Sequence, residues 1–342
     1  MIEVLSASAL ATVQDLGRLG ALRWGVGTSG AMDTLALAAG NLLLGNDEGA
    51  AGIEVQMFPF QVRFTQDCRF ALTGADCGAQ LDDRPLLPWW AHEARAGQTL
   101  RLTIPQRGPV PACRAYLCLA GGIDVPLALG SRSTQLRGAF GGFDGRALRR
   151  GDVLQAGSPG LGDGAGGVAN GSGFGFGFGL VPPALGLPLR VDGLPAIRVL
   201  PAAEYGSYTE ASQQSFWSEP WKITPQSDRY GFRLAGPTLT PLQPFEMRSH
   251  GIVPGVIQVP PSGQPIVQMR EAQPSGGYPK FGTVIEADMW RLGQAPIGSQ
   301  VRFIETTWDE AVAALAEVEA WLADVRRVIG LHAAFPAAKG GR

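Results

Sequence analysis

The segment 249–278 restricts the fold more than any other part of the sequence, because it combines two short β-prone runs with a dense set of turn residues. The β-prone runs span residues 256–259 and 266–269. The turn residues between them include Pro260, Pro261, Ser262 and Gly263, which favour a tight reversal of the chain. We therefore predict a β-hairpin here.

The register of this hairpin determines where its two glutamines lie. With Ser262 and Gly263 at the centre of the turn, Gln258 faces Val267, and each face of the hairpin carries one glutamine. A buried glutamine needs partners for its oxygen and for both N–H donors. Protein groups, water or a ligand can supply them, so a structural hairpin and a binding site both remain open.

The residues after the hairpin combine a charged side chain, a glycine-rich loop and an aromatic ring. Glu271 directly follows the second strand, and we expect it to be exposed within a cleft of the second domain. The alternative interpretation makes Glu271 an ion-pair partner of Arg270 or Lys280. The loop that follows supplies backbone N–H groups and a flat wall; its candidate ligand residues are Ser275, Gly276, Gly277 and Tyr278.

The overall composition indicates a globular protein built mainly from short strands. A length of 342 residues predicts two domains, and 48 glycines with 26 prolines favour turns over long helices. A net charge of −2 gives no electrostatic reason to expect nucleic acid or an anionic membrane as a partner. No apolar run approaches the ~20 residues of a membrane span, and the first residues carry no basic segment. We therefore expect a cytoplasmic protein.

The cysteines and histidines do not form a metal-binding pattern. The chain has four cysteines and three histidines, and no two cysteines have the CxxC spacing. We expect no metal site, and we interpret the cysteines as small buried thiols in a reducing compartment.

The first domain, predicted over 1–157, contains two candidate sites for anions. Asp15 and Arg18 lie in a glycine-rich segment, where they form either a loop-fixing ion pair or part of a ligand site. Arg132 stands between two hydroxyl residues, and its planar fork suits a carboxylate or a phosphate. Its alternative interpretation is a buried arginine that binds loop carbonyls. Two local elements are also expected: a helix over 34–44 capped by Asp33, and a strand within 115–122 buried on both faces.

The remaining chain is divided by a change in composition. Residues 158–188 are rich in glycine and phenylalanine and are predicted to be a linker. The second domain is predicted over 189–330, followed by a tail over 331–342. Thr307 and Glu310 form a capping box at the start of a helix that we expect to end at Gly330.

Several spaced motifs together resemble one known family. They are TVQDLGRLG, SGAMD, LAGGIDVPLALGSRST, SDRYGFRLAG, VPGVIQVPPSGQPIVQM and QPSGGYPK. The chain resembles the biotin-dependent carboxyltransferase-related family, also called allophanate hydrolase subunit 2, which includes the C-type subunit of bacterial ATP-dependent 5-oxoprolinase. It is also similar to half of the carboxyltransferase domain of urea carboxylase. The resemblance implies a mainly β fold, with two cyclophilin-like β-barrel domains and a few helices, including one at the C-terminus.

The resemblance also implies a function, partners and site residues. It implies a component that helps convert 5-oxoproline to glutamate with ATP, in complex with the kinase-inhibitor-like B-type subunit and with the A-type subunit of 5-oxoprolinase. The isolated chain is then expected to be inactive. The alternatives are a carboxyltransferase component that uses biotin on a separate carrier, and a non-enzymatic regulator that binds a kinase-inhibitor homologue. The candidate catalytic residues are Glu271, Arg132 and Arg229, and the candidate substrate-binding residues are Gln258, Gln268, Ser275, Gly276, Gly277, Tyr278, Asp15 and Arg18.

Overall fold

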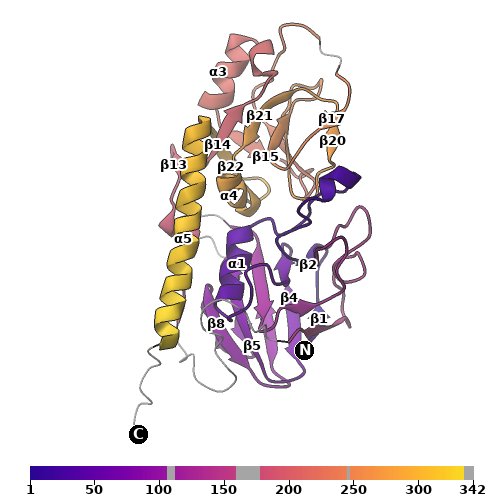
Figure 1. Ribbon diagram of the computed structural model, residues 1–342, viewed down its shortest axis with the longest axis vertical. Helices are drawn as coiled ribbons and strands as arrows, with labels where there is room; N and C mark the ends of the chain where they lie inside the picture. The colour runs from indigo at the N-terminus through magenta and orange to yellow at the C-terminus, as the bar shows by residue number, and fades with distance from the viewer. Residues whose placement is uncertain (106–111, 159–177, 245–246, 335–342) are drawn as a thin grey trace. The chain divides into compact units, whose positions relative to one another are not determined.

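The computed structural model describes residues 1–105, 112–158, 178–244 and 247–334 of the chain (Figure 1). The chain separates into two compact units. Unit 1 consists of Met1–Gly17, Thr34–Gly186 and Glu319–Arg342, and unit 2 consists of Arg18–Asp33 and Leu187–Val318. Most of the predicted linker, residues 159–177, lies outside the described residues.

Unit 1 is built around two antiparallel sheets, of seven and five strands within the described residues. In spatial order, the first sheet consists of β11 (Ile123–Asp124), β12 (Val153–Ala156), β1 (Ile2–Ser6), β4 (Phe60–Phe64), β9 (Thr99–Leu102), β6 (Gln80–Leu81) and β7 (Arg84–Pro85). The second consists of β2 (Ala11–Gln14), β3 (Gly52–Val55), β10 (Ala115–Leu119), β5 (Cys68–Gly74) and β8 (Trp90–Ala94).

The core of unit 1 joins apolar side chains from both sheets, among them Val4, Val62 and Leu117. Strand β10 is buried at every position, as predicted from its continuous apolar run. Helix α1 (Thr34–Leu42) packs against β5 and β10 (Figure 1). Asn41 within this helix donates to the carbonyls of Glu48 and Ala50, so its buried amide is satisfied. Unit 1 also contains the short helix α2 (Pro183–Gly186).

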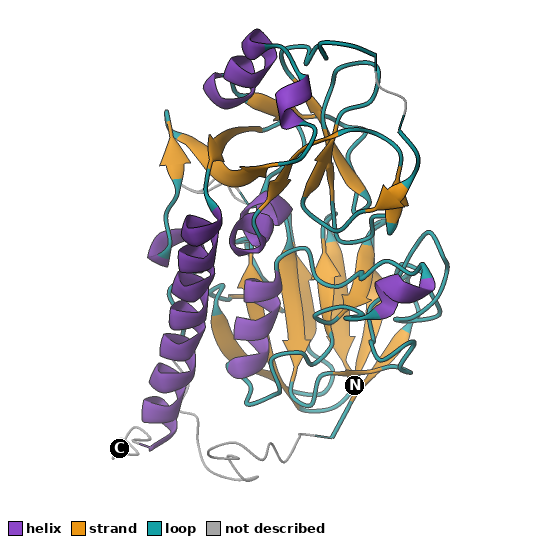
Figure 2. Ribbon diagram, turned by 45° about the horizontal axis from the view of Figure 1, so that its top comes forward, coloured by secondary structure: helices purple, strands orange, loops and turns teal. Residues whose placement is uncertain are grey.

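Unit 2 contains a closed barrel. The strands follow the order β14 (Leu194–Pro201), β21 (Lys280–Val284), β18 (Val256–Gln258), β19 (Ile266–Gln268), β16 (Gly231–Ala235), β15 (Trp221–Ile223) and β22 (Gln300–Glu305). Strand β22 pairs in parallel with β14 and closes the ring, and β13 (Arg190–Val191) extends β14 as a hairpin. The strands and helices of both units are shown in Figure 2. The prediction of a mainly β fold is confirmed.

Aromatic side chains fill the core of unit 2. The rings of Phe216 and Phe303 stack with centroids 4.9 Å apart, and Met32, from the short N-terminal segment of this unit, lies in the same core. Within the described residues, the short helices of the unit are η1 (Ala21–Trp24), η2 (Tyr205–Ser207), α3 (Glu210–Ser218), η3 (Glu286–Asp288) and α4 (Met289–Gln294). A two-stranded ribbon joins β17 (His250–Gly251) to β20 (Ser275–Gly276).

The long helix α5 (Trp308–Ala334) begins with the predicted capping box. The Thr307 N–H donates to Glu310 Oε2 at 2.8 Å, and the Glu310 N–H donates to Thr307 Oγ1 at 3.3 Å. The predicted end at Gly330 is wrong, because the helix continues to Ala334. A glycine inside a helix costs about 1 kcal/mol but does not block it, and a stacked contact between Phe178 and His332 secures the last turns. Within the described ranges, no helix is long and apolar enough to cross a membrane.

Candidate substrate site

A buried ion pair joins Arg229 and Glu271, two of the candidate residues in unit 2. Arg229 occupies the turn before β16, and Glu271 the turn after β19. Arg229 Nε donates to Glu271 Oε1 at 2.6 Å, and Arg229 Nη2 donates to the Gly30 carbonyl at 2.6 Å. The Glu271 N–H also donates to the Arg229 carbonyl at 2.9 Å. These bonds join three separate chain segments around one desolvated pair of charges.

The environment of Glu271 differs from the sequence prediction. The residue is 3% exposed, so the expectation of an exposed carboxylate in a cleft is wrong. Its ion-pair partner is Arg229, whereas Arg270 pairs with Glu286 at 2.7 Å. The physical reason is the barrel: β16 and β19 are neighbours, so the turns at their ends meet and bury both side chains.

The two hairpin glutamines lie on the same face and bind each other. Gln268 Nε2 donates to Gln258 Oε1 at 3.0 Å, and Gln258 Nε2 donates to the Tyr278 carbonyl at 3.2 Å. Both side chains are buried. The prediction of one glutamine on each face is therefore wrong.

A shift of one residue in the hairpin register explains this difference. Gln258 pairs with Ile266, not with Val267. The turn begins at Pro260, whose carbonyl accepts from the Gly263 N–H at 2.9 Å. Side chains alternate between the two faces of a strand. A shift by one residue therefore moves every side chain of one strand to the other face of the hairpin, relative to its partner strand.

The glycine-rich loop lies directly over this glutamine pair. A Cβ atom on Gly276 would lie 2.6 Å from Gln258 Nε2, so a side chain here would displace the Gln258 amide from its present position. Ser275 and Gly276 form strand β20. A Cβ on Gly277 would lie 3.3 Å from the Met247 carbonyl. Tyr278 is 46% exposed.

Sequence reasoning did not include Ser29 among the candidate residues. Its neighbours bind the centre of the site: Thr28 Oγ1 donates to the Arg270 carbonyl at 3.4 Å, and the Gly30 carbonyl accepts from Arg229. Ser29 itself is buried and has a φ angle of 53°. The Arg18 N–H donates to the Thr28 carbonyl at 2.7 Å, which places this candidate beside the same segment. Ser29 belongs to the SGAMD motif, which was one of the motifs that indicated the family. The residues that this motif contacts, such as Arg229, are remote in sequence, so the motif alone could not place Ser29.

In unit 1, Asp15 organises the loop that carries Arg132. The Ser131 hydroxyl and the Arg132 N–H donate to the Asp15 carboxylate at 2.7 and 2.5 Å, and the Ser133 hydroxyl donates to it as well. The Arg132 Nε donates to the Val125 carbonyl at 3.0 Å. Asp15 thus has a loop-fixing role, and Arg132 binds a loop carbonyl, as its alternative interpretation suggested, with a side chain that is partly exposed.

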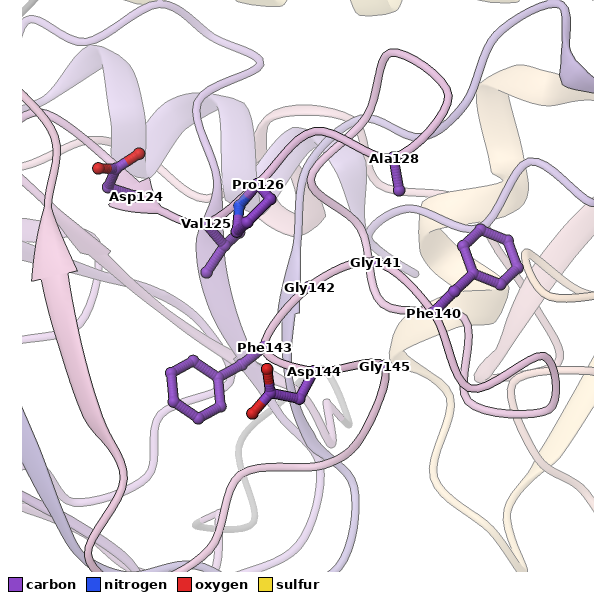
Figure 3. A pocket seen from close by; sticks show the side chains of 10 residues that line it. All are labelled: Asp124, Val125, Pro126, Ala128, Phe140, Gly141, Gly142, Phe143, Asp144 and Gly145. Carbon is purple, nitrogen blue, oxygen red and sulfur yellow. The ribbon is translucent and has the colours of Figure 1, made fainter.

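A pocket of about 380 Å³ lies beside this loop (Figure 3). Residues 124–128 line one part of it and residues 140–145 another. Its wall combines the rings of Phe140 and Phe143 with the carboxylates of Asp124 and Asp144. Arg132 approaches Asp124 at 4.0 Å.

The pocket loop is anchored by a two-bond ion pair between Arg146 and Asp152. Arg146 donates to the two oxygens of Asp152 at 2.7 and 2.8 Å. The hydrogen bond from Arg146 holds the pKa of the Asp152 carboxyl below its usual value. The Arg146 guanidinium also lies 5.1 Å from the centre of the Phe143 ring, so the anchor supports a side chain of the pocket wall directly.

The structure therefore groups the candidate residues within each unit. Unit 1 brings together Asp15 and Arg132. In unit 2 the two glutamines contact each other and the loop, and Arg229 contacts Glu271. Among the described residues, no group of three or more His, Cys, Asp or Glu side chains is arranged to hold a metal ion.

Comparison with known proteins identifies relatives over almost the whole chain. The C-type subunit of 5-oxoprolinase from Haemophilus influenzae is 41% identical over 329 residues, which cover 96% of this chain and 99% of that protein. The C-type subunit of 5-oxoprolinase from Escherichia coli is also 41% identical, over 92% of this chain and 94% of that protein. The crystal structure of the K. lactis urea amidolyase superposes with a TM-score of 0.81 at 27% identity, and covers 94% of this chain but 20% of that enzyme.

A family model described as the carboxyltransferase domain, subdomain A and B, matches residues 24–305. This range includes the complete barrel, from β14 to β22, and it also includes Ser29 and Arg132. The chain therefore belongs to the carboxyltransferase domain family, subdomain A and B.

Proposed function

We propose that this chain is a component of an ATP-dependent 5-oxoprolinase, which opens the lactam of 5-oxoproline to glutamate. The observation that carries the proposal is the 41% identity to two proteins named as the C-type subunit of 5-oxoprolinase, over nearly their full lengths. In this proposal the chain acts in a complex with the kinase-inhibitor-like B-type subunit and with the A-type subunit.

The buried amides of unit 2 support recognition of a lactam. A lactam presents one N–H donor and one carbonyl acceptor, and a glutamine side chain offers the complementary groups. Gln258 and Gln268 are held in one orientation by their mutual hydrogen bond and by the Tyr278 carbonyl. We assign them to orienting the substrate amide, with Tyr278, Ser275 and the backbone of Gly276 and Gly277 closing over it.

The Arg229–Glu271 pair suits a positioning role. Its hydrogen bonds already link the Gly30 carbonyl to the turn at Glu271, and both side chains are desolvated. Such a pair fixes the geometry of neighbouring groups, because each charge is costly to move while buried. Arg132, with its partly exposed guanidinium, is proposed to hold an anionic group at unit 1.

ATP supplies the energy for lactam opening, because an amide is a poor electrophile until its oxygen is made a better leaving group. The pocket of unit 1 does not fit a triphosphate, since Asp124 and Asp144 present like charge along its wall. The sequence also has no Walker-type phosphate loop. We therefore propose that ATP binds in the complex and not in this pocket.

The second candidate function is carboxyl transfer, favoured by the family description and by the fit to urea amidolyase. In that case biotin is carried by a separate protein, since the three lysines of this chain, Lys222, Lys280 and Lys339, do not lie in a biotin-attachment motif of the AMKM type.

Co-expression with the cognate A-type and B-type subunits tests the proposal. We expect ATP-dependent turnover of 5-oxoproline by the complex, and none by the isolated chain or by the other subunits alone. Turnover by the isolated chain contradicts the proposed need for partners. ATP-independent carboxylation of urea from a carboxybiotin carrier, without 5-oxoproline turnover, establishes the second function instead.

A further inference from the structure

Several buried polar atoms of unit 2 have no hydrogen-bond partner among the residues that the structure describes, and two of them lie in segments of the candidate site. These two are the hydroxyl of Ser29 and the Oε1 atom of Gln268, in side chains that are 1% and 4% exposed. Buried polar atoms nearly always have partners, so each exception requires an explanation such as a bound ligand.

The hydrogen bonds around Gln268 fix the kind of group that its remaining atom requires. The Tyr278 carbonyl can only accept, so the atom of Gln258 that faces it is the amide nitrogen. Gln258 Oε1 therefore faces Gln268 and accepts from its nitrogen. The remaining atom of the Gln268 amide is an oxygen, which needs an N–H or O–H donor.

The position of Ser29 is fixed from both sides. Thr28 binds the Arg270 carbonyl, and Gly30 binds Arg229, which in turn binds Glu271. Gln268 lies two residues before Arg270 in the same chain segment. At φ 53° a serine is strained where a glycine is not. The property that serine adds at this place is its hydroxyl.

We propose that Ser29 and Gln268 bind one ligand through the N–H/C=O edge of a cis amide. The Ser29 hydroxyl donates to the carbonyl oxygen of the ligand, and Gln268 Oε1 accepts from its N–H. A lactam ring holds N–H and C=O on the same side, and a ureido group presents the same edge. The inference rests on the proposed function, for which it names the residues that recognise the lactam. Strand β20, formed by Ser275 and Gly276, pairs only with the two-residue strand β17 in the described ribbon. Because so few hydrogen bonds hold it, we assign β20 as the segment that opens to admit the ligand.

The test compares Ser29→Ala, Ser29→Gly and Ser215→Ala in the complex with the A-type and B-type subunits. Ser215 lies on α3, where its hydroxyl donates to the Ser212 carbonyl, so this control removes the same group elsewhere in unit 2. Binding of 5-oxoproline and of biuret, a stable ureido compound, is measured by calorimetry without ATP. We expect both Ser29 variants to raise the Kd of the bound ligand by about tenfold, the effect of one lost hydrogen bond in a buried site. Ser29→Gly should melt no lower than Ser29→Ala, since glycine accepts this backbone conformation.

A second comparison tests Gln268 with the lactone analogue of 5-oxoproline, which has a ring oxygen in place of the N–H. The wild-type complex should prefer the lactam by about tenfold or more, and Gln268→Met should abolish the preference, with melting temperature recorded to confirm folding. If Gln268→Met does not fold, the wild-type complex still tests whether the ligand must offer an N–H donor. Equal affinity of the wild-type complex for the lactam and the lactone would overturn the proposed role of Gln268.

The outcomes separate this inference from the proposed function. Binding of 5-oxoproline with an unchanged Kd in both Ser29 variants overturns the inference and leaves the function. If the wild-type complex binds biuret but not 5-oxoproline, and Ser29→Ala weakens the binding of biuret, the inference is supported and the proposed 5-oxoprolinase function is overturned. Binding of neither ligand by the wild-type complex overturns both.

Discussion

Among single residues, Glu271 is predicted to make a large contribution to stability, because its carboxylate is buried in an ion pair. The change Glu271→Gln removes a carboxylate that pairs with the buried guanidinium of Arg229. Removing one partner of a buried pair costs about 3–5 kcal/mol. We therefore expect a loss of that order in the free energy of unfolding, measured with urea.

Glu286→Gln is the matched control, because Glu286 pairs with Arg270 but is largely exposed. Exposed pairs contribute about 0–1 kcal/mol. The double variant Arg229→Met/Glu271→Leu should regain most of the stability lost by Glu271→Gln, because it removes both charges. An unchanged unfolding free energy in Glu271→Gln would contradict the buried pair.

Between elements, the contact of α4 with the N-terminal segment of unit 2 determines how the Ser29 segment is held. A Cβ atom on Gly293 would lie 2.3 Å from the Met32 carbonyl, which belongs to the backbone and cannot rotate away. Overpacking of this kind costs about 1–3 kcal/mol, while alanine in a helix gains about 1 kcal/mol over glycine. Because the clash is with backbone, we expect it to outweigh the helix propensity, so Gly293→Ala should lower the free energy of unfolding by up to about 2 kcal/mol.

Gly206→Ala provides the comparison, since a Cβ atom on Gly206 meets no atom within 4 Å. Thermal unfolding of both variants measures the difference. Equal melting temperatures for the two variants would show that α4 does not pack against Met32 in this way.

The loop that forms the pocket of unit 1 should make stability depend on pH. The folded-state pKa of Asp152 lies below its ordinary value because Arg146 donates to the carboxylate. As pH falls, the unfolded chain therefore binds the proton first, at about pH 4. The contribution of Asp152 is complete above that pH and is lost as pH falls through the folded-state pKa.

The change Asp152→Asn should flatten this acid-side slope of the unfolding free energy. At neutral pH it should also lower stability by about 1.5–3 kcal/mol, the range for hydrogen bonds to charged groups. Asp144→Asn should change stability by less than about 0.5 kcal/mol, because Asp144 is largely exposed. Denaturant titrations from about pH 2 to about pH 7 measure both effects. A slope that persists in Asp152→Asn would assign the acid sensitivity to other carboxylates.

At the scale of the whole molecule, unit 2 requires a segment that precedes most of unit 1 in the sequence. Residues 18–33 supply Met32 to its core, the Gly30 carbonyl to Arg229 and the Asp33 carboxylate to Gln294 at 2.8 Å. We therefore expect the fragment 187–318 to fold poorly alone. Addition of the peptide 18–33 should increase its helical and near-ultraviolet circular dichroism signals, whereas a scrambled peptide of the same composition should not. A fragment that is fully folded without the peptide would show that the segment is dispensable.

The local elements of this protein follow from its sequence alone. The capping box at Thr307, the buried run of β10 and the hairpin strands at 256–258 and 266–268 each depend on residues a few positions apart. Such patterns act within one turn of helix or along one strand, so they can be read without knowing the fold. The motifs that indicate the family can be read in the same way.

The assembly of the candidate site, in contrast, depends on tertiary contacts. Arg229 binds Glu271 across 42 positions and Gly30 across 199 positions, and the pairing of β16 with β19 brings Arg229 and Glu271 together. The turn at Pro260 set the register that places Gln258 and Gln268 on one face. Burial removed both Glu271 and Ser29 from solvent. These properties depend on contacts between remote segments, and the energy of such contacts is not encoded in any local pattern of residues.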